Sequence, residues 1–132
     1  MLTSVLVIDD DAAMTEMLKS ILEPNSFDVI TAHSIQEGIN ATRKLNPDVV
    51  ILDLYLKNGN QACQSIRKFS KVPILILSAL NKPNAVAQAL DEGADDYLIK
   101  PVPSGVLVAH IKNLIRRSQA EQVASNATAD PL

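Results

Sequence analysis

Short apolar segments alternate with helical patterns along the chain. Five segments rich in Val and Ile have the length of strands, and apolar residues at helical spacing follow each of them. Three of the five are nearly continuous hydrophobes, which is typical of strands that are buried on both faces of a parallel sheet covered by helices. The predicted strands are 5–8, 28–32, the segment from 48, the segment from 73, and 96–100.

Helix start and stop signals support this alternation. Asp11 stands directly before AAMTEMLKSIL, and Ser34 with Glu37 three residues later has the spacing of a capping box. Asn81, with a proline two residues later, predicts the start of a helix that reaches residue 92. Gly93 is expected to end that helix. The pattern therefore predicts five strand–helix units, (βα)5.

The composition fits one compact domain. A chain of 132 residues with 47% apolar content supports one core and is too short for two ordinary domains. The last predicted helix starts at about residue 104 and passes residue 117, after which SQAEQVASNATADPL becomes small and polar. We therefore expect one domain over 1–117 and a frayed helix end with a polar linker or tail over 118–132.

Charge, cysteine content and hydropathy argue against several classes of protein. The formal net charge is −3, so we expect no basic face that would bind nucleic acid directly. Cys63 is the one cysteine and lies in an amphipathic segment, which predicts a buried structural thiol in a reducing compartment. The start of the chain has no basic leader, and no apolar run approaches the roughly 20 residues of a membrane span. We expect a cytoplasmic protein without membrane contact.

Polar side chains follow four of the five predicted strands. Open parallel sheets gather functional groups beyond the carboxyl ends of their strands. Carboxylates crowded there repel one another unless a divalent cation lies among them, and Mg²⁺ prefers such oxygen ligands. A carboxylate beside Mg²⁺, a lysine and a hydroxyl can accept a phosphoryl group, and Asp53 suits that nucleophilic role. The residues at these strand ends are Asp9, Asp10, Asp11, Asp53, Ser78 and Lys100.

Each of these residues also has a simpler interpretation. An aspartate after a strand often caps the next helix, and we expect Asp11 to do only that. Lys100 with the proline after it fits an ordinary turn, whereas Asp53 would be an unexplained charge in the apolar run VVILDLYL. The coincidence of polar groups at four strand ends favours a functional site.

The strings that carry these residues resemble a known family. From about residue 3 to residue 117 the chain resembles the receiver domains of bacterial response regulators, through VLVIDDD, VVILDLYL, PILILSA and GADDYLIKP. The strings LSA and GADDYLIKP and the final IRR are most similar to receivers that precede a winged-helix DNA-binding domain. The resemblance implies a flavodoxin-like, doubly wound α/β fold of three layers, with a five-stranded parallel sheet in the order 2-1-3-4-5. It also implies a phosphorylation-dependent switch that regulates transcription through an output domain, not an enzyme.

The resemblance assigns the chemistry to individual residues. Asp53 would accept a phosphoryl group from a sensor histidine kinase or a phosphotransfer domain. Lys100 would pair with that group. Mg²⁺ or Mn²⁺ would be bound by Asp9, Asp10, Asp53 and the main-chain carbonyl of Tyr55.

The resemblance also implies a switch. The Ser78 hydroxyl would hydrogen-bond the phosphoryl group, and Tyr97 would then turn inward and alter the face made by the fourth helix, fifth strand and fifth helix. For Tyr97 alone, the simpler interpretation is a surface tyrosine on an edge strand. The Lys100–Pro101 bond is expected to be cis, in a turn that directs the lysine into the pocket.

The loop after Asp53 departs from the family pattern. It reads LKNGNQ, with Lys57 in place of a proline and about two residues fewer, so the rim of the pocket is expected to differ. Tyr55 and Leu80 occupy positions that in this family line the route of the attacking water. Because both are bulky or apolar here, we expect slow self-dephosphorylation.

The resemblance further implies a symmetric dimer through the switch face. Relatives pair a basic residue of the fourth helix with a glutamate of the fifth, but both positions are valine here, so an apolar contact would replace the ion pair. Two charged pairs would remain, one with a histidine whose charge varies around neutral pH. The alternatives are that both valines pack within their own subunit, or that they mark a monomer that has lost the interface. The residues of the expected interface are Val86 and Val106, Asp95 with Lys112, and Asp96 with His110.

Two other functions fit parts of the pattern. A haloacid-dehalogenase-like, Mg²⁺-dependent phosphohydrolase also uses a strand-end aspartate, but it needs a second acid two residues later, where this chain has Tyr55. A receiver-like module that binds proteins without phosphate would not need the complete set of acid, hydroxyl and lysine.

Overall fold

The computed structural model describes residues 2–53 and 59–129, except for the side chains of residues 60 and 126–129. Its five strands form one parallel sheet in the order β2-β1-β3-β4-β5, which confirms the predicted order. The order reverses at β1, whose neighbours are β2 and β3. The strands are β1 (Thr3–Ile8), β2 (Phe27–Ala32), β3 (Val49–Leu52), β4 (Ile74–Ser78) and β5 (Asp96–Ile99).

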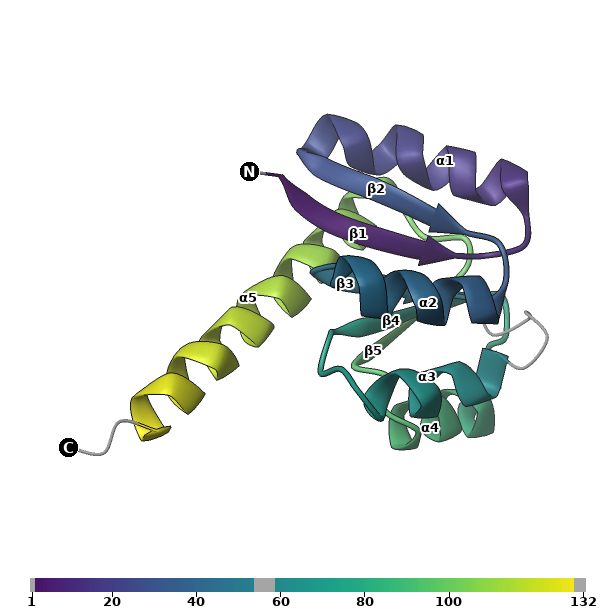
Figure 1. Ribbon diagram of the computed structural model, residues 1–132. Helices are drawn as coiled ribbons and strands as arrows, with labels where there is room; N and C mark the ends of the chain where they lie inside the picture. The colour runs from purple at the N-terminus through teal and green to yellow at the C-terminus, as the bar shows by residue number, and fades with distance from the viewer. Residues whose placement is uncertain (1, 54–58, 130–132) are drawn as a thin grey trace.

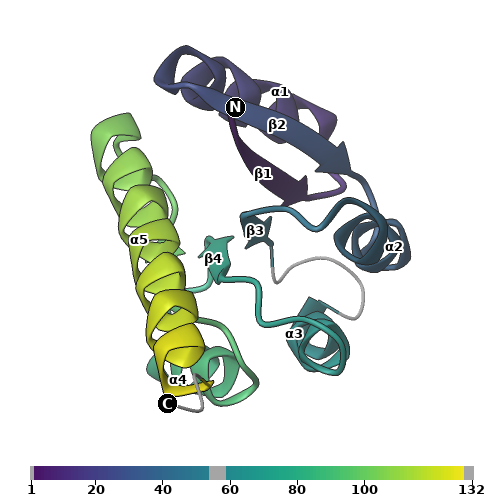
Figure 2. The ribbon, with the colours of Figure 1, turned by 60° about the vertical axis from the view of Figure 1, so that its left-hand side comes forward.

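Helices cover both faces of the sheet (Figures 1 and 2). Leu6 and Ile8 of β1 belong to an apolar cluster completed by the second, third and fourth helices, whereas Val5 and Val7 belong to a cluster with the first and last helices. All four are at most 1% exposed, so β1 is buried on both faces, as its continuous apolar sequence predicts. The helices are α1 (Ala12–Leu22), α2 (Ile35–Leu45), α3 (Gly59–Arg67), α4 (Pro83–Asp91) and α5 (Ser104–Ala129), with a short 3₁₀ turn, η1 (Glu23–Asn25), after α1.

Most of the predicted helix signals are confirmed. The Asp11 carboxylate accepts hydrogen bonds from the N–H groups of Ala13 and Met14 in the first turn of α1, and the Ser34 hydroxyl accepts one from the Glu37 N–H. Gly93 ends the fourth helix with a φ of 115°. The N-cap of α4 is Lys82, so the expected cap Asn81 lies one residue too early, a shift typical of helix boundaries.

The last helix is longer than the sequence pattern predicts. It continues to Ala129 through the segment that was expected to fray, and Figure 1 shows its end projecting away from the sheet. The Ala, Gln and Glu residues of this segment have good helix propensity and extend a helix that is already formed and packed. The division between 1–117 and 118–132 remains a prediction.

Cys63 and the helices bear on the predicted thiol and on membrane contact. Cys63 is buried in α3 at 1% exposure, and burial raises the pKa of its thiol to about 11, which fits the structural role predicted for it. Within residues 2–53 and 59–129, none of the helices combines the length and apolar character needed to cross a membrane.

Candidate functional site

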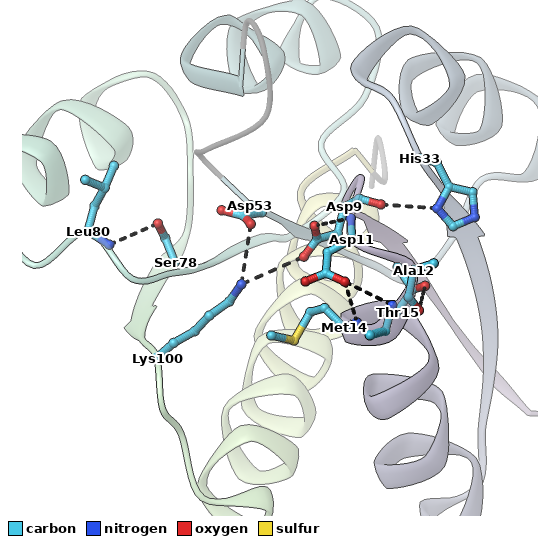
Figure 3. A network of polar contacts seen from close by, with 11 residues as sticks. Asp9, Asp11, Ala12, Met14, Thr15, His33, Asp53, Ser78, Leu80 and Lys100 are labelled. Carbon is cyan, nitrogen blue, oxygen red and sulfur yellow. Dashed lines mark hydrogen bonds and ion pairs between the residues drawn. The ribbon is translucent and has the colours of Figure 1, made fainter.

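Three strand ends bring two carboxylates and an ammonium group together at one edge of the sheet (Figure 3). Asp9 and Asp53 directly follow Ile8 and Leu52, which are register partners of β1 and β3. The side chain of Lys100, just after β5, reaches towards both acids. Its Nζ lies 3.4 Å from Asp53 Oδ2 and 3.8 Å from Asp9 Oδ2. The topology therefore assembles groups that are far apart in the sequence.

The two carboxylates at this edge are buried. Asp9 is 3% exposed and Asp53 is 8% exposed. Burial raises the pKa of Asp9 above its ordinary value, and the negative charges of Asp53 and Asp10 add to the rise. The Asp11 N–H, 3.0 Å from Asp9 Oδ1, and the Lys100 ammonium oppose it. Burial outweighs these two contacts, so the pKa of Asp9 stays above its ordinary value. The carboxylate oxygens of Asp9 and Asp53 are ligands of the kind that a divalent cation prefers.

The predicted hydroxyl lies on the same edge. Ser78 ends β4 and is fully buried. Its Oγ accepts a hydrogen bond of 3.2 Å from the Leu80 N–H, and the Leu80 carbonyl accepts one of 2.7 Å from the Tyr97 hydroxyl. Leu80 is thus linked through its backbone to both residues of the predicted switch. Tyr97 is half-buried on β5, at the edge of the sheet.

The remaining acids of this edge differ from one another. Asp10 is exposed, and the Asp11 carboxylate caps α1 as predicted. Tyr55 and Lys57 lie outside the described residues. Among the side chains that are described, no three His, Cys, Asp or Glu residues are grouped so that they could hold a metal ion. The carboxylate chemistry fits Mg²⁺, but the described side chains alone do not complete a ligand set.

A cis peptide bond and a histidine side chain accompany the site. The Lys100–Pro101 bond is cis, as the resemblance implied. The Nδ1 atom of His33, just after β2, lies 3.2 Å from the carbonyl oxygen of Asp9, where it can donate a hydrogen bond. Sequence analysis missed His33, although its position directly after a strand was a usable signal.

The residues of the expected dimer face form contacts within the chain. His110 Nδ1 lies 2.6 Å from Asp96 Oδ2, and Asp95 forms an ion pair of 2.7 Å with Arg67. Val106 is 43% exposed, Val86 is half-buried, and Lys112 is exposed. The two acids are therefore already bound by neighbours in the same chain, which the sequence pattern did not predict.

Fold and site together define a doubly wound α/β protein whose acids, lysine and serine meet at the carboxyl edge, next to the reversal in strand order. Residues 5–112 match the family described as the response regulator receiver domain, and the chain belongs to this family. Membership confirms the predicted fold and a role in two-component signalling. It does not favour a phosphohydrolase or a phosphate-independent module.

Curated relatives carry the same domain within longer proteins. The chain is 38% identical over 128 residues to the DNA-binding response regulator MtrA of Mycolicibacterium paratuberculosis (strain ATCC BAA-968 / K-10), covering 96% of this chain and 57% of MtrA. It is 36% identical over 121 residues to the KDP operon transcriptional regulatory protein KdpE of Escherichia coli (strain K12), covering 90% and 54%. The chain thus spans a little over half the length of these transcriptional regulators, the class of relatives that the resemblance implied.

Solved structures agree with the fold. A response regulator receiver domain protein from Clostridium thermocellum superimposes with a TM-score of 0.83 at 33% identity, covering 90% of this chain and 98% of that one. A CheY-like receiver domain protein from Methanospirillum hungatei JF-1 gives a TM-score of 0.86 at 24% identity, covering 92% and 99%, which supports the fold alone.

Proposed function

We propose that this chain is a phosphorylation-controlled switch in which Asp53 accepts a phosphoryl group from a sensor histidine kinase or a phosphotransfer domain. The observation that carries the proposal is the Lys100 ammonium, which lies 3.4 Å from Asp53 and 3.8 Å from Asp9 at the carboxyl edge of the sheet. In this position it can neutralise both the acceptor and the oxygens of an incoming phosphoryl group.

The transfer itself needs little from the protein beyond position and charge. An Asp53 oxygen attacks phosphorus, the P–N bond to the donor histidine breaks, and that imidazole leaves with its electron pair. The product is an acyl phosphate on Asp53. Catalytic turnover is not expected, apart from self-phosphorylation by small donors and slow self-dephosphorylation at a rim that includes Tyr55 and Leu80.

The acceptor assignment is tested with a matched pair of variants. Asp53→Asn is nearly isosteric but cannot attack phosphorus, so it should abolish the mass gain that acetyl phosphate and Mg²⁺ produce in the unaltered chain. Asp28→Asn, at an exposed aspartate at the start of β2, should leave that gain intact. Intact-mass spectrometry decides the outcome. A full mass gain in Asp53→Asn would move the acceptor elsewhere.

Mg²⁺, or Mn²⁺, would be held by Asp9, Asp10, Asp53 and the carbonyl of Tyr55. When bound, it would neutralise charge between the carboxylates and the phosphoryl oxygens. Two buried carboxylates, Asp9 and Asp53, lie at the same strand ends, and their oxygens support a cation here. Asp10→Asn should lose most of the Mg²⁺ affinity in an NMR titration. Amide shifts centred away from residues 9, 10 and 53 would contradict this site.

The signal would leave the site through Leu80. In the present conformation the Ser78 hydroxyl accepts from its N–H, and Tyr97 donates to its carbonyl. A phosphoryl group on Asp53 would offer the Ser78 O–H a charged acceptor, and a hydrogen bond to a charged group is stronger than one between neutral groups. We expect the Ser78 side chain to turn towards the phosphoryl group. Tyr97 would then lose its hydrogen bond to the Leu80 carbonyl and turn inward. The α4-β5-α5 face would change as a result.

That face would serve as the surface of an activated homodimer. Val106, Leu90 and Ile99 are each 43% exposed on α5, on α4 and at the end of β5. Exposed apolar side chains on three neighbouring elements are typical of a surface that another protein covers, and here they favour self-association. Because the relatives named above regulate transcription, we expect an output domain to read this dimer, in the cytoplasm, without direct DNA contact by the receiver domain.

A further inference from the structure

The guanidinium group of Arg67, the last residue of α3, joins three segments of the backbone. Its Nε donates to the Gly93 carbonyl at 3.1 Å, and its Nη1 donates to the carbonyls of Val72 at 2.7 Å and Ser70 at 3.3 Å. Its Nη2 donates to Asp95 Oδ2 at 2.7 Å. Arg67 therefore ties the end of α3 and the loop before β4 to the turn between α4 and β5.

Asp95 extends this connection into the sheet. The oxygen that accepts from Arg67 also accepts a hydrogen bond of 2.8 Å from the N–H of Ile74, the first residue of β4. Hydrogen bonds to charged groups are worth roughly twice as much as those between neutral groups. The α4–β5 turn is thus bound from one side by a cation and from the other by the central sheet.

The turn itself fits closely against the arginine. Its backbone bonds, Gly93 N–H to Leu90 and Ala94 N–H to Ala89, form a Schellman motif in which Gly93 has a φ of 115°. A Cβ atom at Gly93 would lie 2.8 Å from Cγ of Arg67. The C-terminal end of α4 therefore has little freedom to move while the arginine is in place.

The N-terminal end of α4 is attached in a different way. It follows Leu80, whose backbone is bonded to Ser78 and Tyr97, the two residues of the proposed switch. The helix between the two ends packs lightly: within α4, every residue of which is described, Ala89 alone is buried. The segment that leads into α4 is thus bonded, at Leu80, to residues that should rearrange on phosphorylation. The turn after α4 is bonded to Arg67 and to Ile74 at the start of β4, the opposite edge of the sheet from Asp53.

We propose that Arg67 is a positioning residue that fixes the C-terminal end of α4 at Gly93 and Asp95, so that α4 turns about this end when Leu80 is released. The inference rests on the proposed function for the origin of the release. The role of Arg67 does not depend on how Leu80 is released. Freeing Leu80 changes the N-terminal end of α4, and Arg67 prevents the change from reaching the α4–β5 turn.

Hydrogen exchange measured on the full chain tests the fixed end without any phosphodonor. Tyr97→Phe removes the hydroxyl that bonds Leu80 and should speed exchange in 80–86 while leaving 92–95 unchanged. Arg67→Gln should do the reverse, with exchange in 92–95 faster by about tenfold or more, as the loss of charge-assisted hydrogen bonds implies. In the double variant the effect of Tyr97→Phe should extend to 92–95, which should exchange faster than in Arg67→Gln alone. Lys68→Gln, at the exposed neighbour of Arg67, serves as the control.

The same exchange measurement with beryllium fluoride and Mg²⁺, which mimic a phosphoryl group on Asp53, tests whether phosphorylation causes the release of Leu80. In the unaltered chain it should change exchange in 80–86 and spare 92–95, whereas in Arg67→Gln the change should extend to both. Equal changes at both ends of the unaltered chain, or a Tyr97→Phe effect that reaches 92–95 with Arg67 present, would overturn the fixed end. Failure to form the Asp53 adduct would instead contradict the proposed function. Asp95→Asn, which weakens the same contact, repeats the test if Arg67→Gln does not fold.

Discussion

The carboxyl edge of the sheet buries charged groups, whereas the α4-β5-α5 face exposes apolar ones. At the edge, charged groups are buried: Asp9 and Asp53 are 3% and 8% exposed, with Lys100 between them. On the face, apolar groups are exposed, with Val106 at 43%. Each departs from the usual distribution of side chains, in which charges face solvent and large apolar groups lie inside. Such departures cost stability and so mark the two places where a ligand or a partner is expected.

The largest expected effect comes from removing Lys100, whose ammonium group lies beside both buried carboxylates. Lys100→Met should slow formation of the Asp53 adduct from acetyl phosphate on the order of a hundredfold, because transition-state charge loses a preorganised partner. Lys44→Met, at an exposed lysine of α2, provides the matched control. Time-resolved intact-mass spectrometry gives both rates. Equal rates for the two variants would show that Lys100 does not assist phosphoryl transfer.

A smaller effect is expected on the exposed face. Val106→Glu places a charge in the apolar interface and should weaken activated self-association by about tenfold, a loss of about 1.4 kcal/mol. High salt should affect the unaltered dimer little, because its contact would be largely apolar. Sedimentation with and without beryllium fluoride measures this, with Val123→Glu as control, at a residue of α5 that is 68% exposed and is not among the expected interface residues. A monomer under both conditions, or equal behaviour of the two variants, would contradict the dimer.

The smallest effect concerns the stability cost of the buried acids. Burial raises the folded-state pKa of Asp9 above its ordinary value of 3.8, so the ionised carboxylate is less favourable in the folded chain than in the unfolded one. The cost is present at neutral pH and disappears as the pH falls below 3.8. Without Mg²⁺, Asp9→Asn should therefore raise the Tm at pH 7, and the gain should vanish in acid. A lower Tm at pH 7 would mean that the Lys100 contact outweighs burial.

The two regions also differ in how far the sequence predicted them. The edge was predictable because its residues sit directly after strands: once the strands are parallel, Asp9, Asp53 and Lys100 must reach the same edge whatever the details of packing. The strand order was implied by the family resemblance, whereas the caps at Asp11 and Ser34 were predictable from local spacing. Backbone geometry of this kind follows from patterns within a few residues.

The contacts of the face were decided by tertiary structure. Arg67 and Asp95 are 28 residues apart, and Asp96 and His110 are 14 apart. No periodicity connects them, and the acids were expected to bind across a dimer instead. Their actual partners depend on where the end of α3 and the surface of α5 lie against β5. The length of α5 was also missed, because a weakly apolar segment stays helical when it continues a helix anchored in a core. The sequence by itself thus determined which groups reach the edge of the sheet, and only packing between distant elements decided which charges meet on its flank.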